Sequence, residues 1–148
     1  MKTRKDHLNT IKGLFSVQKL AVLSTQNQGQ PYASLVAFSF SQDLEQLYFL
    51  TPTTTRKYGN LTACDRVALL INSACNQADD FTKAVSVTAT GRAGALTDKA
   101  GPLTDYLTRH PQLADFSKEP STAVVCVDVD AYIMVRRFQE VVTLRMVP

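Results

Sequence analysis

The stretch that decides the fold runs from residue 51 to residue 61 and reads TPTTTRKYGNL. It combines the end of a strand, a turn rich in hydroxyl groups and the start of a helix. The N-terminus of a helix offers unpaired N–H groups and a partial positive charge, which together favour a bound anion. Arg56 and Lys57 add positive charge there, which destabilises a helix unless an anion neutralises it. The pattern indicates either a phosphate site or a threonine N-cap followed by two solvated basic residues.

Before this stretch, the apolar residues indicate one helix and three strands. Residues 4–16 carry apolar side chains at helical spacing. Apolar runs at residues 19–25 and 32–41 flank a polar turn at residues 26–29, which is typical of a β-hairpin. Residues 46–51 form a third strand that leads directly into the hydroxyl-rich turn.

After this stretch, helices and strands alternate less regularly. Residues 66–72 form an almost continuous apolar run, which indicates a strand buried on both faces. We expect a loop at residues 73–80, a helix stop at His110-Pro111 and a break between strands at residues 128–131. The expected elements are a helix at 56–63, strands at 66–72 and 83–96, a helix at 99–109, and strands at 123–129, 132–138 and 141–146.

The order of these elements predicts an α+β fold. The chain has about eight expected strands and three helices, and strands mostly follow strands directly, so the sheet is antiparallel. Such a sheet closes, or nearly closes, on itself as a barrel with helices at its ends. The length of 148 residues suits one domain spanning residues 1–148, and no linker or internal repeat interrupts it.

Composition excludes several classes of protein. The net charge is +3 and the basic residues are scattered, which argues against a nucleic-acid-binding protein. Three cysteines without CxxC spacing and two histidines argue against a disulfide framework and a metal site. The polar N-terminus does not resemble a signal peptide, and no apolar run approaches the roughly 18 residues that span a bilayer. We therefore expect a cytoplasmic protein without a membrane partner.

Taken in order, these features resemble the pyridoxamine 5′-phosphate oxidase-like, FMN-binding split-barrel family. The resemblance covers most of the chain and rests on an ordered set of segments. These are LAVLST at 20–25, PYASLV at 31–36, LYFLT at 47–51, the Thr-Arg-Lys helix start with Asn60-Leu61, RVALL at 66–70 and VSVTATGRA at 85–93. It implies an antiparallel split β-barrel of Greek-key type, FMN as cofactor, and a homodimer with the cofactor at the subunit interface.

The resemblance also implies the residues that bind the cofactor. The strand matching residues 32–38 lies against the flavin ring, mainly through backbone groups, and the strand matching residues 48–51 lines the ribityl chain. The helix start takes the phosphate, and a loop of the partner subunit completes the pocket. The implied cofactor residues are Ser34, Leu35, Val36, Leu50, Thr51, Thr55, Arg56, Lys57, Asn60 and Gln77. From the residues alone, Ser34 is a strand hydroxyl without a ligand, Leu35 and Val36 are ordinary core, and Asn60 lies on the helix surface.

The implied function is flavin-dependent oxidoreduction of an unidentified small molecule. The sequence contains no recognisable set of catalytic side chains, as expected if the flavin carries the redox chemistry. We expect no oxidation of pyridoxamine phosphate, because the C-terminal Arg/His substrate segment of true pyridoxamine phosphate oxidases has no counterpart. The alternatives are a non-catalytic protein of the same fold that binds a flavin, a deazaflavin or haem.

One further motif, Arg109-His110-Pro111, resembles haem-utilisation relatives within the same superfamily. The simpler interpretation, which we favour, is that His110 ends a helix and interacts favourably with its dipole.

Overall fold

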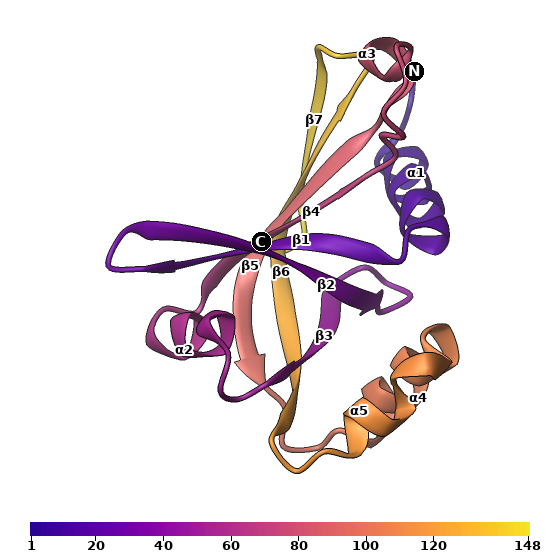
Figure 1. The fold of residues 1–148 in the computed structure, drawn as a ribbon. Helices are drawn as coiled ribbons and strands as arrows, with labels where there is room; N and C mark the ends of the chain where they lie inside the picture. The colour runs from indigo at the N-terminus through magenta and orange to yellow at the C-terminus, as the bar shows by residue number, and fades with distance from the viewer.

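The strands of the computed structural model, which describes residues 1–148, close into a barrel (Figure 1). Strands β1 to β6 form the barrel through the order β3-β2-β1-β4-β5-β6 and a closing pair between β3 and β6, and β7 extends the sheet beyond β6. All pairs are antiparallel. Because β4 lies beside β1, the order is that of a Greek key. The expected α+β class and antiparallel split β-barrel are confirmed.

The elements are α1 (Arg4–Val17), β1 (Leu20–Asn27), β2 (Gln30–Phe40), β3 (Gln46–Pro52), α2 (Arg56–Ala63), β4 (Arg66–Asn72), α3 (Asp80–Lys83), β5 (Ser86–Ala95), α4 (Ala100–Arg109), the 3₁₀ turn η1 (Pro111–Leu113), α5 (Ala114–Lys118), β6 (Thr122–Arg136) and β7 (Glu140–Arg145). The boundaries expected for α2 and β4 are confirmed, and those of α1, β1, β2, β3, β5, α4 and β7 agree within a few residues. The short helices α3 and α5 were not expected.

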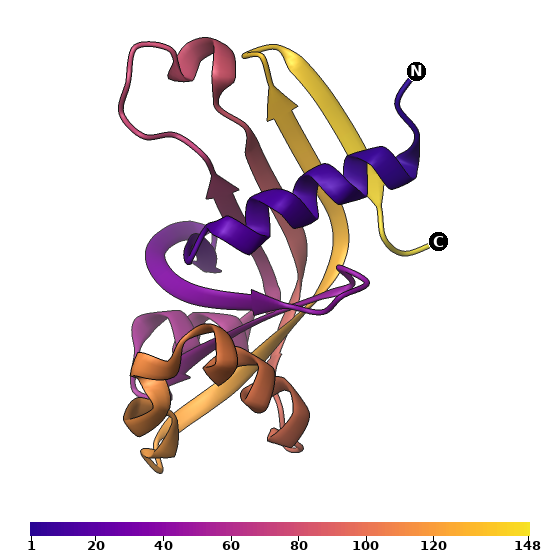
Figure 2. The same cartoon turned by 90° about the vertical axis from the view of Figure 1, so that its right-hand side faces the viewer.

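Helix α1 lies across the strands on one side of the barrel (Figure 2). Thr3 starts it with a capping box: its hydroxyl accepts from the Asp6 N–H at 3.2 Å, and the Asp6 carboxylate accepts from the Thr3 N–H at 2.9 Å. The apolar stripe of the helix then buries Ile11, Leu14 and Phe15 against the barrel.

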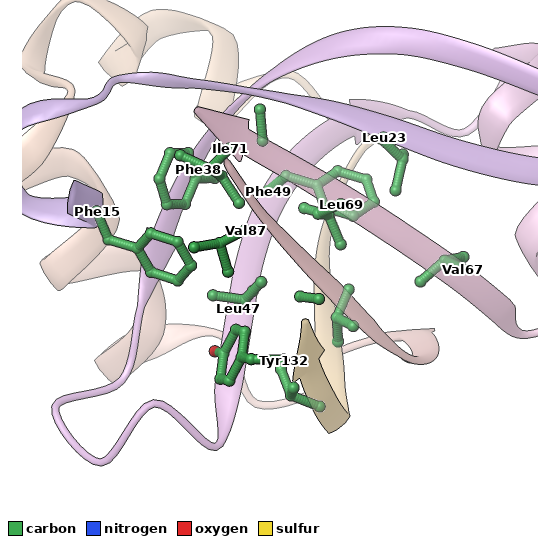
Figure 3. Close-up of a cluster of buried hydrophobic side chains, with 14 of the residues drawn as sticks. Phe15, Leu23, Phe38, Leu47, Phe49, Val67, Leu69, Ile71, Val87 and Tyr132 are labelled. Atoms are coloured by element: carbon green, nitrogen blue, oxygen red, sulfur yellow. The ribbon is translucent and has the colours of Figure 1, made fainter. Parts of the chain in front are cut away.

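The core fills the inside of the barrel with side chains from alternating strand positions (Figure 3). The ring of Phe15 meets the rings of Phe38 and Tyr132 edge to face, with centroids 5.5 and 5.8 Å apart. The Tyr132 hydroxyl donates to the Leu44 carbonyl at 2.7 Å, which satisfies the polar end of this buried side chain. A smaller cluster of Leu50, Tyr106 and Val124 lies beneath α4.

The expectation of two separate strands at residues 123–129 and 132–138 is wrong, because β6 is one strand of 15 residues. The register against β5 shifts between Thr90 and Gly91, so residues 128–131 form a bulge instead of a break. A Cβ on Gly91 would lie 2.2 Å from the Asp128 carbonyl oxygen. Only glycine allows the two backbones to approach this closely.

The expectation that β4 is buried on both faces is also wrong for a single chain. Val67, Leu69 and Ile71 point into the core, but Leu70 on the outward face is 37% exposed. The apolar run therefore has one face in the core and one face that nothing in this chain covers.

His110 is buried and does not act as a charged helix end. Its Nε2 lies 2.7 Å from the Phe38 carbonyl oxygen, and 1% of the residue is exposed. Burial lowers its pKa, and the nearby cations Arg109 and Lys19 lower it further. The imidazole is therefore neutral at pH 7, so the favourable dipole interaction expected for a protonated histidine is absent.

We predict that Gly91→Ala lowers the free energy of unfolding by about 1–3 kcal/mol, because the new Cβ forces the β5 and β6 backbones apart. The loss corresponds to a fall in melting temperature of about 2–4 °C per kcal/mol. Gly94→Ala on the same strand is the control, since no atom lies within 4 Å of its Cβ position. Thermal unfolding followed by circular dichroism measures both, and equal melting temperatures would contradict the bulge geometry.

We predict that the protein loses stability between pH 7 and about pH 5.5, partly through His110. The unfolded state takes up a proton as the pH falls through the ordinary histidine pKa of 6.5, whereas the native state, with its lower pKa, does not. The free energy of unfolding therefore falls with pH in this window. Urea unfolding at each pH measures this free energy. It should fall less in His110→Gln, whose side-chain amide still offers a donor to the Phe38 carbonyl. The same fall in both proteins would rule out this role.

Candidate functional site

The N-terminus of α2 is built from the hydroxyl-rich turn that follows β3. Thr55 is the N-cap, and its hydroxyl accepts from the Tyr58 N–H at 3.3 Å and donates to the Pro52 carbonyl at 3.0 Å. The buried Thr51 hydroxyl lies 2.7 Å from the Thr55 hydroxyl. These bonds hold the turn in one conformation. The predicted threonine N-cap is therefore present.

The charge at this helix end is entirely positive. The first turn of α2 contains Arg56 and Lys57 and no acidic residue. Neither side chain forms an ion pair. Two unneutralised cations thus stand at the positive end of a helix, an arrangement that favours an anion.

A polar cleft of about 530 Å³ lies between α2 and the β1–β2 hairpin. Its lining residues are Asn27, Gln30, Pro31, Tyr32, Arg56 and Asn60. The Arg56 guanidinium lies over the Tyr32 ring, 5.2 Å from its centroid, which holds the cation at the cleft wall. No acidic side chain lines the cleft, so an anionic group meets only positive and neutral polar groups there.

Asn60 is not the helix-surface residue that its position suggested. It is 6% exposed, and its amide donates at 3.0 Å to the hydroxyl of Thr25 on β1, which is 2% exposed. This bond ties α2 to the inside of the barrel and fixes the orientation of the helix beside the cleft.

The first half of β2 has an open edge. Residues 30–37 pair with β1, but pairing with β3 begins only at Phe38. The Phe38 N–H donates to the Lys19 carbonyl on the β1 side. Since peptide groups alternate in direction along an antiparallel strand, those of Ala33 and Leu35 face away from β1, where no strand pairs with them. They are available to a ligand.

Side chains of the predicted cofactor strand face in two directions. Val36 is buried in the core, whereas Leu35 points outward and is 65% exposed. The Ser34 hydroxyl is buried and has no hydrogen-bond partner in the chain. The hydroxyls of Ser39 and Thr122 are likewise buried without a partner.

Of the ten predicted cofactor residues, only Arg56 and Asn60 line the cleft, and two of the others lie elsewhere in the chain. The side chain of Leu50 belongs to the cluster beneath α4, with Tyr106 and Val124. Gln77 precedes α3, at the opposite end of the molecule from α2 (Figure 1). Its backbone N–H donates to the Asp80 carboxylate at 3.1 Å. Within a single chain, Gln77 therefore does not reach this site.

The hairpin residues Asn27, Gln30 and Pro31 line the cleft but were not expected to do so, whereas Tyr32 begins the strand expected to lie against the flavin ring. In the sequence the first three indicated only a turn and the start of a strand. Their position at the cleft depends on the packing of α2 against the hairpin, which residue spacing does not reveal.

Two of the three cysteines have raised pKa values. Burial raises the pKa of Cys126 to about 11, and the hydrogen bond to Asp80 raises the pKa of Cys75, so both stay protonated thiols at neutral pH. No three His, Cys, Asp or Glu residues are grouped to hold a metal ion. No helix is long and apolar enough to cross a membrane. The site can bind and orient an anionic ligand.

Solved structures with the same fold differ in what their descriptions say they bind. A heme binding protein from Mycobacterium smegmatis matches with a TM-score of 0.82 and 15% identity, over 98% of this chain and 59% of that one. A FAD-binding protein from Mesorhizobium loti matches with a TM-score of 0.68 and 17% identity, over 86% and 90% of the two chains.

A third structure comes from Clostridium acetobutylicum and is described as related to general stress protein 26 of B. subtilis, in the pyridoxinephosphate oxidase family. It matches with a TM-score of 0.75 and 14% identity, over 97% of both chains. At these identities the structures show the shared fold only. No curated protein matches the sequence.

The family model described as pyridoxamine 5′-phosphate oxidase matches residues 9–136, which is most of the chain and includes β1 to β6, α2 and the cleft. On that match, and with the split barrel it accompanies, the chain belongs to the pyridoxamine 5′-phosphate oxidase family.

Proposed function

We propose that this protein binds FMN, with the phosphate at the N-terminus of α2 and the ring along the open edge of β2, and that it acts as a flavin-dependent oxidoreductase on a small molecule. The observation that carries the proposal is the pair of unneutralised cations, Arg56 and Lys57, at a helix N-terminus beside a cleft without acidic residues. A phosphate group removes the repulsion between these charges and the helix dipole.

The open edge of β2 suits the ring of a flavin. The edge of the ring carries acceptors and one donor, which the free peptide groups of Ala33 and Leu35 can match without a charged side chain. The unpartnered Ser34 hydroxyl adds a donor or acceptor beside them. These features support a flavin as the ligand and agree with the relation in fold to a FAD-binding protein.

A bound flavin supplies the redox chemistry, since it accepts and returns electrons. The chain has to bind, orient and shield it. Arg56 and Lys57 hold the phosphate end, Thr51 and Thr55 keep the turn rigid, and β2 presents backbone groups to the ring. The bond between Asn60 and Thr25 keeps the two ends of the site at a constant separation.

Haem is the second candidate ligand, because of the relation in fold to a heme binding protein. The histidine in the motif that resembles haem-utilisation relatives is an unsuitable iron ligand, since His110 is buried and its Nε2 is bonded to the Phe38 carbonyl. The cations at α2 suit a phosphate as well as a haem propionate, but the unpaired peptide edge suits only a ligand with ring donors and acceptors. Flavin is therefore the preferred assignment, with deazaflavin as a variant that the phosphate site also accepts.

We further propose a homodimer formed through the outward face of the sheet. One row of larger residues crosses six strands in register: Leu35, Val22, Leu70, Thr88, Ile133 and Thr143. The parallel row beside it carries smaller residues on four strands, Ala33, Ser24, Ala68 and Ala131, and Thr90 on β5. A ridge beside a groove on one face complements itself about a two-fold axis. The apolar outward face of β4 then becomes buried.

A neighbouring cleft supports the same interface. Leu70 also lines an apolar cleft of about 360 Å³ together with Phe81 and Phe138. Both phenylalanines are about two-thirds exposed, at 67% and 65%, and their ring centroids are 6.0 Å apart. Exposed aromatic pairs of this kind are common anchors of protein interfaces. Phe81 lies in the same segment as Gln77, so this interface accounts for how a second copy completes the cofactor site.

We predict that FMN binds to the purified protein and that Arg56→Ala/Lys57→Ala weakens binding at least about 100-fold, since each charged hydrogen bond is worth about 1.5–3 kcal/mol. Quenching of FMN fluorescence measures the affinity. Lys2→Ala/Lys5→Ala removes the same charge from exposed positions at the N-terminal end of the chain and should bind like the wild type. Absence of FMN binding to the wild type would overturn the flavin assignment, and titration with haem and a deazaflavin would then identify the ligand. Equal affinity of both double variants would overturn the phosphate site.

We predict that the protein elutes with the mass of a dimer, which is twice the chain mass of 16.3 kDa, and that Leu70→Asp yields a monomer. The substitution buries a carboxylate in the centre of the ridge, which an apolar interface does not tolerate. Val17→Asp is the control, because Val17 is 72% exposed at the end of α1 and lies outside the ridge. Light scattering at micromolar concentration decides: a monomeric wild type, or a dimeric Leu70→Asp, would exclude this interface.

A further inference from the structure

Arg109 is a partly buried cation without an acidic partner. Its guanidinium lies 5.0 Å from the centroid of the Phe38 ring and 5.2 Å from that of the Phe40 ring. It donates to the Phe38 carbonyl at 3.0 Å and to the carbonyls of Phe15 and Gln18. One side chain from α4 therefore joins β2 to the end of α1.

Two neighbouring residues of the same helix end make bonds of the same kind. The ring Nε2 of His110 lies 2.7 Å from the Phe38 carbonyl oxygen, and the Tyr106 hydroxyl donates to the Ala37 carbonyl at 2.9 Å. Burial raises the pKa of Tyr106 to about 12, so its hydroxyl stays protonated and remains a donor. Tyr106, Arg109 and His110 thus satisfy the carbonyls of two successive β2 residues.

These bonds lie at the point where β2 changes partners. Ala37 is the last residue paired with β1, and Phe38 is the first paired with β3. The Ala37 carbonyl faces the same open edge as the peptide groups of Ala33 and Leu35. The Phe38 carbonyl faces the opposite, β1 side, because the N–H of the same residue donates to the Lys19 carbonyl there. Helix α4 therefore satisfies one carbonyl on each edge of β2 at the point where the open edge ends.

We propose that Tyr106, Arg109 and His110 form a latch that holds both edges of β2 where its open edge ends and so positions the segment Ala33–Ala37 for its ligand. None of the three touches that ligand, so they act as positioning residues. The role of flavin as the ligand rests on the function proposed above, whereas the latch rests on the hydrogen bonds of the chain itself.

The latch explains why three polar side chains with different chemistry cluster at one helix end. Arginine suits the position because its planar fork can reach carbonyls from separate segments, which a single ammonium group cannot do in the same geometry. His110-Pro111 ends the helix directly after the arginine, so the three side chains stay on the face of α4 that meets β2.

The test compares two tyrosine-to-phenylalanine variants. Tyr106→Phe deletes the bond to Ala37 and keeps the ring in its cluster. Tyr132→Phe is the matched control, because it deletes an equally buried bond from a tyrosine hydroxyl to a carbonyl, that of Leu44, away from the open edge. Arg109→Lys is the stronger variant, since it keeps the charge and loses the fork. Each protein is measured for unfolding, for FMN affinity, and for amide hydrogen exchange across residues 33–37.

The latch predicts a specific pattern in these measurements. Both tyrosine variants lose similar stability, but only Tyr106→Phe weakens FMN binding, by about 3- to 10-fold, as expected for the loss of one hydrogen bond from a neutral donor. Arg109→Lys weakens FMN binding further, because a hydrogen bond from a charged donor is stronger. The visible circular dichroism of bound FMN changes in the same two variants. Unchanged FMN affinity in Arg109→Lys, or equal losses in Tyr106→Phe and Tyr132→Phe, would overturn the positioning role.

Hydrogen exchange separates a failure of the latch from a failure of the flavin assignment. If the wild type binds no FMN, the proposed function fails. Faster exchange of residues 33–37 in Arg109→Lys and Tyr106→Phe than in Tyr132→Phe still supports the latch, and equal exchange in all variants overturns it.

Discussion

The structure depends on the change of partners along β2. All seven residues of β3 pair with β6, but only Leu47, Tyr48 and Phe49 also pair with β2, at its end. The first half of β2 is therefore bonded on one side only. Unpaired peptide groups are unfavourable when buried and available when exposed to a ligand. The open edge, the helix that ends it and the adjoining cleft all follow from this arrangement.

The two ends of the proposed site use different physical principles. At α2, charge dominates: a helix N-terminus and two cations attract an anion, whose exact chemical identity matters little to the Coulomb attraction. Along β2, geometry dominates, because only a ligand with donors and acceptors at the spacing of a strand can use the free peptide groups. A phosphorylated flavin satisfies both requirements. The bond between Asn60 and Thr25 holds α2 at a fixed position relative to the barrel. Such a site leaves redox chemistry to the ligand, which agrees with the absence of a thiolate at Cys75 and Cys126 and of a grouped metal-ligand set.

The outward face links the fold to assembly. An apolar run such as residues 66–72 resembles a strand covered on both faces, and the structure covers only one of them. In the homodimer that we propose, a second copy packs against the row containing Leu70 and covers this face. The same arrangement would bring the loop with Gln77, which lies at the opposite end of its own barrel from α2, towards the proposed cofactor site of the partner.

The sequence by itself determined the local elements and the chemistry of the phosphate end. Capping, turn residues and apolar spacing act over a few residues, so the boundaries of α2 and β4 and the positive charge at Arg56 and Lys57 could be predicted from the chain alone. Only the tertiary structure decided which half of β2 stays unpaired, that Arg56 lies over Tyr32, that Asn60 is buried against Thr25, and that β6 continues through a bulge where Gly91 passes Asp128. Each of these features depends on strand pairing or packing between residues distant in sequence. The free energy of such contacts depends on how closely the residues approach in space, which the spacing of residues along the chain does not indicate.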